Sequence, residues 1–230
     1  LARFFRAQKK DVFFLTGTDE HGQKIERNAK EKGKKPKEFC DEMSKKFSDA
    51  WKVMNVEPDR FIRTTDADHQ AFVKDFVRKV WESGDIYKGK YEGYYCVDCE
   101  AFYPLKDLSE GMICPVHKRK AEFLAEETYF FRLSKYQKQL LKLYKDNPEF
   151  ILPDSRRHEI KNRVEEGLKD LSITRTTFSW GIPFPYDTKH VIYVWFDALI
   201  NYLSGAGPDQ KYWPADLHLL VMRCGRRYAA

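Results

Sequence analysis

Long hydrophobic runs are missing from this 230-residue sequence. No apolar stretch approaches the roughly 20 residues that a membrane-spanning helix needs, and no secretory leader is visible at the start. Internal repeats and low-complexity segments are missing too. Since 42% of the residues are hydrophobic and 15% aromatic, the chain can bury a full core. The sequence therefore predicts a folded globular protein rather than a disordered or membrane-spanning one.

Cysteine is scarce, with five residues in the chain, and their odd number does not suit a disulfide scaffold. This usage predicts a reducing, cytoplasmic location. The net charge of +6 is only mildly basic, so it permits a polyanionic partner without establishing one. We expect neither a membrane nor DNA as a partner. The sequence also opens without an initiator methionine, from which we expect that other residues precede it.

A short apolar run at residues 12–15 is followed by Thr-Gly-Thr-Asp-Glu-His-Gly at 16–22. The run predicts a buried strand, and ligands of open α/β sheets bind beyond the carboxyl ends of such strands. Asp19 and His21 are therefore candidate functional residues. The alternative is a polar loop that caps the next helix, since Thr18 and Asp19 are good capping residues. From the residues alone the two interpretations are nearly even.

Three helices are predicted between this loop and residue 84: one over residues 23–32, which ends at Gly33, and two that carry apolar stripes. The first of these two starts at Pro36, and we expect its stripe in the core, with Cys40 as a buried thiol beside it. The stripe consists of Phe39, Met43, Phe47, Trp51 and Met54. The second of the two runs from Asp66 to Gly84, with a stripe formed by Phe72, Val73, Phe76, Val77, Val80 and Trp81. His69 lies off this stripe, which predicts a surface histidine.

Two ligand pairs with metal-site spacing occur in the middle of the chain. Cys96 and Cys99 form the first pair, Cys114 and His117 form the second, and 14 residues separate the two pairs. Turns of this kind converge on one tetrahedral zinc ion, and four protein ligands leave no position for water. The pattern predicts one structural zinc. Free thiols or a disulfide are the weaker alternatives.

A strand followed by a helix is predicted near the end of the sequence. Residues 190–196 have the apolar composition of a buried strand, and the helix is expected to begin near Asp197. Trp195, Ala198 and Tyr202 then lie near the edge of the sheet, where an aromatic wall suits a thioether side chain. Ordinary core packing is the favoured alternative when these residues are considered alone. A last parallel strand is predicted at residues 216–221.

Four blocks of this sequence resemble the methionyl-tRNA synthetases. They are residues 14–25 (Phe-Leu-Thr-Gly-Thr-Asp-Glu-His-Gly-Gln-Lys-Ile), 84–96, 127–133 and 193–202. The resemblance extends from about residue 1 to Leu220. It implies an α/β fold: a Rossmann-like parallel sheet interrupted by a small inserted α+β zinc-binding domain. The implied boundaries are 1–85 and 169–230 for the catalytic domain and 86–168 for the insert.

The resemblance also implies a function, methionine–tRNA ligase. The substrates would be methionine, ATP with Mg²⁺, and tRNA(Met). Asp19 matches the acid that pairs with the α-ammonium group of methionine, and Trp195, Ala198 and Tyr202 match the methionine pocket. His21 and Arg175 are further candidate active-site residues.

The resemblance ends after Leu220, where a Gly-Lys-Asp stretch and a pocket histidine are expected but absent. The two ATP-binding signatures of the family, His-Ile-Gly-His and Lys-Met-Ser-Lys-Ser, are also missing from these 230 residues. We therefore expect a fragment that is inactive alone. The alternative is a non-catalytic, zinc-bearing RNA-binding module built on a relict synthetase core.

Overall fold

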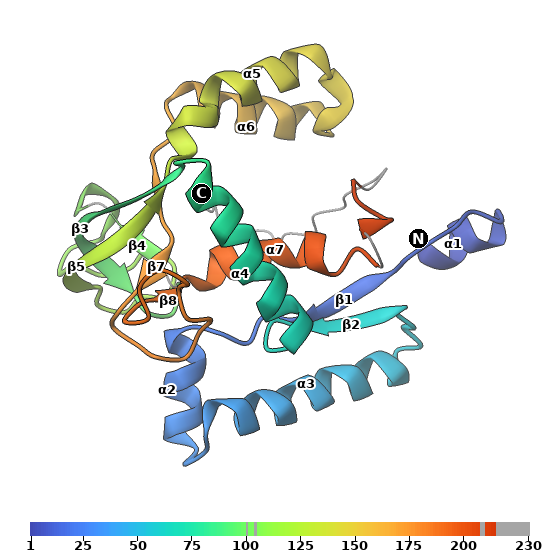
Figure 1. Ribbon diagram of the computed structural model, residues 1–230, viewed down its shortest axis with the longest axis horizontal. Helices are drawn as coiled ribbons and strands as arrows, with labels where there is room; N and C mark the ends of the chain where they lie inside the picture. Colours follow the sequence, from blue (N-terminus) through green and yellow to red (C-terminus); the bar gives the residue numbers. More distant parts are fainter. Residues whose placement is uncertain (100, 104, 208–209, 215–230) are drawn as a thin grey trace.

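The protein is described by a computed structural model that covers residues 1–99, 101–103, 105–207 and 210–214. Figure 1 shows the arrangement of its helices and strands. The strand predicted at 216–221 and the atypical tail after it lie outside the described residues. In the described part, no helix is both long and apolar enough to span a membrane.

Two parallel strands form the first unit, preceded by the short helix α1 (Ala2–Ala7). Strand β1 (Leu15–Thr18) pairs with β2 (Arg60–Arg63), and helices α2 (Gln23–Glu31) and α3 (Pro36–Val53) connect them. The strands approach each other closely at Gly17, where a Cβ atom would lie 1.9 Å from the carbonyl oxygen of Ile62. A parallel pair joined by helices confirms the predicted α/β class.

Strand β1 begins three residues later than predicted and is half-buried rather than buried on both faces. The apolar run at 12–15 overlaps it only at Leu15. Pairing with β2 starts where Leu15 faces Arg60, so the position of the partner strand, and not the composition of the run, sets the start of β1.

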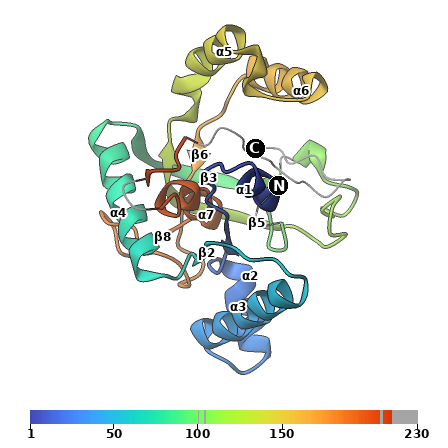
Figure 2. The same cartoon turned by 90° about the vertical axis from the view of Figure 1, so that its right-hand side faces the viewer.

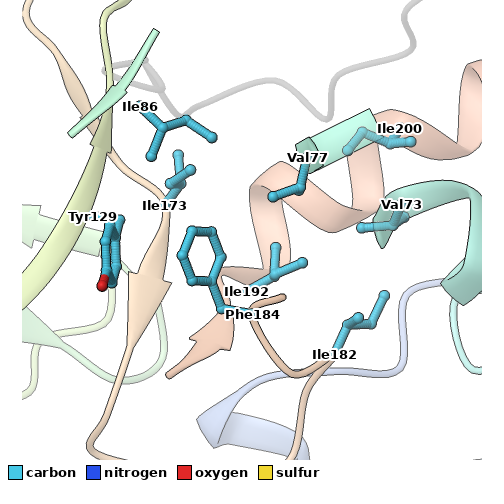
Figure 3. Packing of buried hydrophobic residues seen from close by; sticks show 9 residues of the cluster. All are labelled: Val73, Val77, Ile86, Tyr129, Ile173, Ile182, Phe184, Ile192 and Ile200. Carbon is cyan, nitrogen blue, oxygen red and sulfur yellow. The ribbon is translucent and has the colours of Figure 1, made fainter. Parts of the chain in front are cut away.

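Helices α4 (Ala67–Glu82) and α7 (Val194–Ser204) pack on one common core. The predicted stripe of α4 is confirmed, since Val73 and Val77 are fully buried and the other four residues pack around them. Figure 3 shows the cluster, in which both helices contribute beside strand and loop residues. Its buried members are Val73, Val77, Ile86, Tyr129, Ile173, Ile182, Phe184, Ile192 and Ile200.

The stripe of α3 is only partly in the core. Phe39 and Cys40 are buried as predicted, but Phe47 is 46% exposed and Met54 is 64% exposed. Figure 1 shows that α3 runs along one edge of the molecule with β2 beside its second half, so only one face of that half is covered. The prediction was wrong for the second half of the stripe, because periodicity identifies the apolar face of a helix but not how much of that face other elements cover.

The predicted strand at 190–196 is shorter than expected. Its paired part is β8 (Val191–Ile192), which pairs with β7 (Thr174–Arg175), and the last three residues of the predicted strand belong to a helix. Helix α7 begins at Val194, three residues before the predicted start, and Tyr193 accepts hydrogen bonds from the backbone of Phe196 and Asp197. A short apolar run is compatible with a buried helix as well as a strand, so composition could not separate them.

A four-stranded antiparallel sheet forms the second unit, in the order β4-β3-β5-β6. Its centre is the long pairing of β3 (Ile86–Cys96) with β5 (Glu122–Phe131), flanked by β4 (Ala101–Tyr103) and β6 (Leu171–Ser172). Helices α5 (Gln137–Asp146) and α6 (Asp154–Glu165) stand on the opposite side from α3 in Figure 2. The domain boundaries at 85/86 and 168/169 stay a prediction, and Ile86 and Tyr129 share the core of α4 and α7.

Candidate functional site

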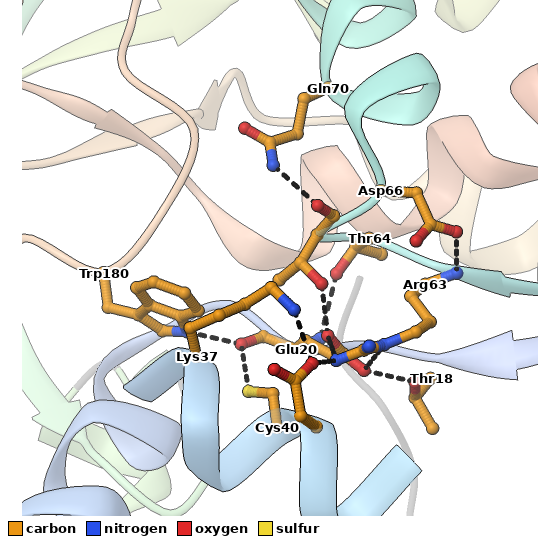
Figure 4. Close-up of polar contacts among 11 residues, drawn as sticks. Thr18, Glu20, Lys37, Cys40, Arg63, Thr64, Asp66, Gln70 and Trp180 are labelled. Atoms are coloured by element: carbon orange, nitrogen blue, oxygen red, sulfur yellow. Dashed lines mark hydrogen bonds and ion pairs between the residues drawn. The ribbon is translucent and has the colours of Figure 1, made fainter. Parts of the chain in front are cut away.

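The loop after β1 is anchored by the side chain of Glu20, which is 3% exposed. Arg63 at the end of β2 donates from two nitrogens to the two carboxylate oxygens, at 2.7 and 2.8 Å. The hydroxyl groups of Thr18 and Thr65 also donate to this carboxylate, at 2.7 and 2.5 Å (Figure 4). Glu20 therefore joins the carboxyl ends of both parallel strands, with its buried charge fully paired.

The backbone of the same loop is held as firmly. The indole of Trp180 donates to the carbonyl oxygen of Glu20 at 2.5 Å, and the N–H of Gly22 donates to the carbonyl of Trp180 at 3.1 Å. The thiol of Cys40 also donates to the Glu20 carbonyl, at 3.4 Å. Burial, and secondarily the charge of Glu20, raises the pKa of Cys40 to about 12. Cys40 is thus a buried, unreactive thiol, as predicted.

Asp19 lies next to this anchor and faces a pocket. The pocket has a volume of about 490 Å³ and lies at the carboxyl end of β1. Asp19 is accessible to solvent, but protein atoms surround it on the other sides, and this partial burial raises its pKa. The negative charge of Asp197 raises the pKa further. A cation bound in the pocket would relieve both effects.

A chain of buried polar groups lies behind Asp19. The Nδ1 atom of His21 is 2.5 Å from Asp197 Oδ2, and the Nε2 atom of His69 is 2.7 Å from Asp197 Oδ1. His69 Nδ1 lies 2.7 Å from the hydroxyl of Ser204. Burial acts to raise the pKa of Asp197, but the hydrogen bonds from both histidines outweigh it and the pKa is lowered.

The prediction that His69 is a surface histidine was wrong: its side chain is completely buried. The apolar stripe of α4 could not reveal this, because the face of His69 is covered by polar partners on α7 rather than by apolar residues.

The three predicted pocket residues of α7 have different surroundings. Tyr202 is 39% exposed and lines the same pocket as Asp19. Trp195 is 43% exposed and Ala198 is buried, and both lie outside the lining of this pocket. The structure thus brings Asp19 and Tyr202 together, while the assignment of all three residues to a methionine site stays a prediction.

Arg175 is 3% exposed and lies within the framework rather than at the pocket. It donates to the hydroxyl of Ser172 and to the carbonyl of Thr174, both at 2.7 Å, and its guanidinium stacks on the ring of Tyr193 at 4.2 Å. In this structure these contacts orient Arg175 toward β6, β7 and the start of α7.

The four predicted metal ligands converge in space. One ligand atom from each of Cys96, Cys99, Cys114 and His117 lies within 4.8 Å of the others. The Cys99 sulfur is 3.5 Å from that of Cys114 and 3.0 Å from the Nδ1 atom of His117. Sulfurs bound to tetrahedral zinc lie about 3.8 Å apart, so a cluster of this size is compatible with that ion.

The three thiols of the cluster differ in their electrostatics: burial raises the pKa of Cys96 and raises that of Cys99 to about 12, whereas the pKa of Cys114 is lowered. Burial alone would raise the pKa of Cys114, but backbone N–H groups of His117 and Val116 donate to its sulfur and lower it. Asp98, inside the first ligand pair, accepts hydrogen bonds from Arg27 of α2 at 2.6 Å and pairs with Arg119 at 3.2 Å. The cluster is thereby tied to the helix that follows the Asp19 loop.

Sequence reasoning missed Arg63, Asp98 and the supporting pair of His69 and Asp197. A signal existed for Asp197, because an acid in the middle of an apolar run must find polar partners when buried. For the other three, the partners are distant in sequence and no local pattern marks them.

The comparisons with known proteins agree with this geometry. A family model described as tRNA synthetases class I (M) matches residues 1–122 and 106–213. The fold and the comparison place the chain in the class I aminoacyl-tRNA synthetases. Within that class, the chain belongs to the family of methionyl-tRNA synthetases.

Individual relatives are similar over nearly all of this chain. The methionine–tRNA ligase of Thermotoga maritima is 53% identical over 98% of the chain, and that of Nostoc is 48% identical over 96%. The chain covers 37% and 44% of these two proteins. A methionyl-tRNA synthetase from Mycobacterium tuberculosis bound by methionyl-adenylate matches with a TM-score of 0.89 and 45% identity, over 94% of this chain and 45% of that one. The apo form matches with a TM-score of 0.77.

Proposed function

We propose that this chain is the part of a methionine–tRNA ligase that recognises methionine. The longer enzyme activates methionine with ATP to methionyl-adenylate and transfers the methionyl group to tRNA(Met). The observation that carries the proposal is the placement of Asp19, held beside a pocket at the carboxyl end of a parallel strand. That is where open α/β folds bind their ligands.

The amino group of methionine is the cation that this pocket suits. Asp19 is the acid that an α-ammonium group would pair with, and its raised pKa reflects burial and the charge of Asp197, for which the nearby histidines give only partial compensation. An ammonium donor completes that compensation through a directional, charge-assisted hydrogen bond. Tyr202 provides an aromatic wall on the same pocket, which suits the thioether of the methionine side chain.

The reaction with ATP requires groups that stabilise the charge on the triphosphate, with Mg²⁺ as the expected metal. We assign these groups to the His-Ile-Gly-His and Lys-Met-Ser-Lys-Ser elements of the family, which are not among the 230 residues. The part of the enzyme present in this chain positions methionine for attack on the α-phosphate, and positioning alone supplies a large share of such catalysis.

We further propose one structural zinc ion at Cys96, Cys99, Cys114 and His117. The convergence of the four ligand atoms supports this assignment, and four protein ligands leave no open position for catalysis. Cysteines 40, 96, 99 and 114 are all free of disulfides, which suits the reducing environment of the cytoplasm.

The test is methionine-dependent ATP–pyrophosphate exchange by the complete enzyme that carries this chain, with leucine and isoleucine as control substrates. Exchange specific for methionine is the expected result. Replacing Asp19 with Ala should cost about 2–5 kcal/mol of transition-state stabilisation, the range for losing one partner of a desolvated charge pair. Asp75→Ala, at an exposed acid on α4, is the matched control. Near-normal exchange by the Asp19→Ala enzyme would contradict the assignment.

A further inference from the structure

We propose that Asp197 is a positioning residue that joins the two halves of the amino-acid site. The first half is the loop after β1 with Asp19, and the second is helix α7 with Tyr202. The inference rests on the proposed function and adds the means by which these two halves keep a fixed separation.

Asp197 cannot act on a ligand directly. It lies in the first turn of α7, its side chain is completely buried, and its two oxygens are occupied by His21 and His69. A buried carboxylate is expensive to desolvate, and an apolar residue of similar size would pack there at less cost. Its presence is explained if the hydrogen bonds that it makes fix other residues in place.

His69 fixes α7 at two points. Its ring bonds to Asp197 through Nε2 and to Ser204 through Nδ1, and these two residues lie at opposite ends of α7. Because His69 belongs to α4, this bridge sets both the rotation and the axial position of α7 against α4. Tyr202 on α7 is thereby fixed relative to the core.

His21 then transmits this position to the loop of Asp19. A carboxylate only accepts hydrogen bonds, so Asp197 requires an N–H at Nδ1 of His21 and at Nε2 of His69. The neighbouring Glu20 is fixed to β2 through Arg63. Asp19 is thus followed by Glu20, which is fixed to β2, and by His21, which is fixed to α7. The distance between Asp19 and Tyr202 therefore depends on the hydrogen bond between His21 and Asp197.

The test uses four variants of the complete enzyme. Asp197→Asn removes the negative charge that accepts both hydrogen bonds, and His21→Leu removes the donor at Nδ1. His21→Asn keeps an N–H near the position of Nδ1. His190→Asn is the matched control, because His190 is an equally buried, hydrogen-bonded histidine at the start of β8. The Michaelis constants for methionine and for ATP are measured in pyrophosphate exchange, with active-site titration to count correctly folded enzyme.

Asp197→Asn and His21→Leu should raise the KM for methionine about ten- to hundredfold, the range for losing a hydrogen bond to a charged group, and leave the KM for ATP unchanged. His21→Asn should stay within about threefold of the unaltered enzyme, and His190→Asn should be unchanged. Imidazole ¹⁵N spectra of the unaltered enzyme should show His21 protonated at Nδ1.

Two results would overturn the positioning role. One is a loss of titratable active sites in Asp197→Asn and His21→Leu with an unchanged KM for methionine, which would show a purely structural role. The other is that His21→Asn is as impaired as His21→Leu, which would show that the imidazole itself is needed. An unaltered enzyme without methionine-dependent exchange would instead reject the proposed function.

Discussion

At the scale of single residues, the buried charges of this protein are compensated one by one. Glu20 is paired with Arg63 and two threonines, and Asp197 is paired with two histidines. Removing one partner of such a group typically costs about 3–5 kcal/mol, because the other charge stays buried without compensation. Asp19 is the contrast, since partial burial and the charge of Asp197 raise its pKa and the nearby histidines offset this only in part.

Asp85 gives a prediction at this scale. Hydrogen bonds from Lys135 and Tyr136, both at 2.6 Å, lower its pKa to about 2. A lowered pKa means that the ionised acid stabilises the folded state above the unfolded pKa of 3.8, and that this contribution is lost as the pH falls toward 2. Asp85→Asn should therefore lower the free energy of unfolding at pH 7, with a difference that shrinks between pH 4 and pH 2.

Urea denaturation of both proteins in parallel, from pH 7 down to the lowest pH at which each still folds, checks this expectation. Asp146→Asn is a suitable control, because that acid is exposed at the end of α5. A difference that stays constant across the whole range would show that packing, and not charge, accounts for the effect.

At the scale of elements, the cysteine–histidine cluster connects the second sheet to the helix that follows the loop after β1. Asp98 between its ligands pairs with Arg27 of α2, which directly follows residues 19–22. A metal in the cluster would hold the turns at β3 and around residue 114 in one geometry. Order at the metal site is thereby linked to order in α2.

We expect one zinc ion per chain, and Cys99→Ser should release it and loosen the second sheet, since structural zinc binding contributes to folding directly. Elemental analysis of chelator-free protein measures the metal, and amide hydrogen exchange of β3 and β5 measures the loosening. Cys40→Ser is the control, because Cys40 is buried but lies outside the cluster. Zinc-free preparations of the unaltered protein would contradict the assignment.

At the scale of the whole molecule, the chain corresponds to about two fifths of its relatives' length. It contains the strand, helix and pocket that we assign to methionine, but not the two family signatures that we assign to ATP. On the proposed function, we expect recognition of the amino acid and charge stabilisation of the triphosphate to reside in different stretches of the longer enzyme.

The 230-residue chain alone should not form methionyl-adenylate. Losing a single donor to a developing negative charge typically reduces a rate by ~10²–10³, and here both signatures are missing. Pyrophosphate exchange by the isolated chain, prepared free of host synthetase, should match a heat-killed control, whereas the complete enzyme should be active. Exchange above that control would mean that phosphate-binding groups lie within these residues. RNA binding without exchange in both proteins would favour the non-catalytic alternative.

The metal site shows what the sequence by itself determined. The spacing of Cys96, Cys99, Cys114 and His117 is a local property, because each pair converges within one turn. The apolar stripe of α4 is likewise a local property, because it follows from helical periodicity. The helix ends before Gly84, whose φ of +74° is a conformation that favours glycine. Asp19 could be named as a candidate because it lies in the polar segment after a predicted strand.

Tertiary structure alone decided what lies around those residues. The start of β1 depends on its pairing with β2, and the start of α7 could not be read from an apolar run that suits strand and helix equally. His69 is buried because Asp197 and Ser204, 128 and 135 residues away, meet it inside the fold. A polar group is buried only where distant partners satisfy its hydrogen bonds, and the identity of those partners is a property of the packed chain rather than of any segment of the sequence.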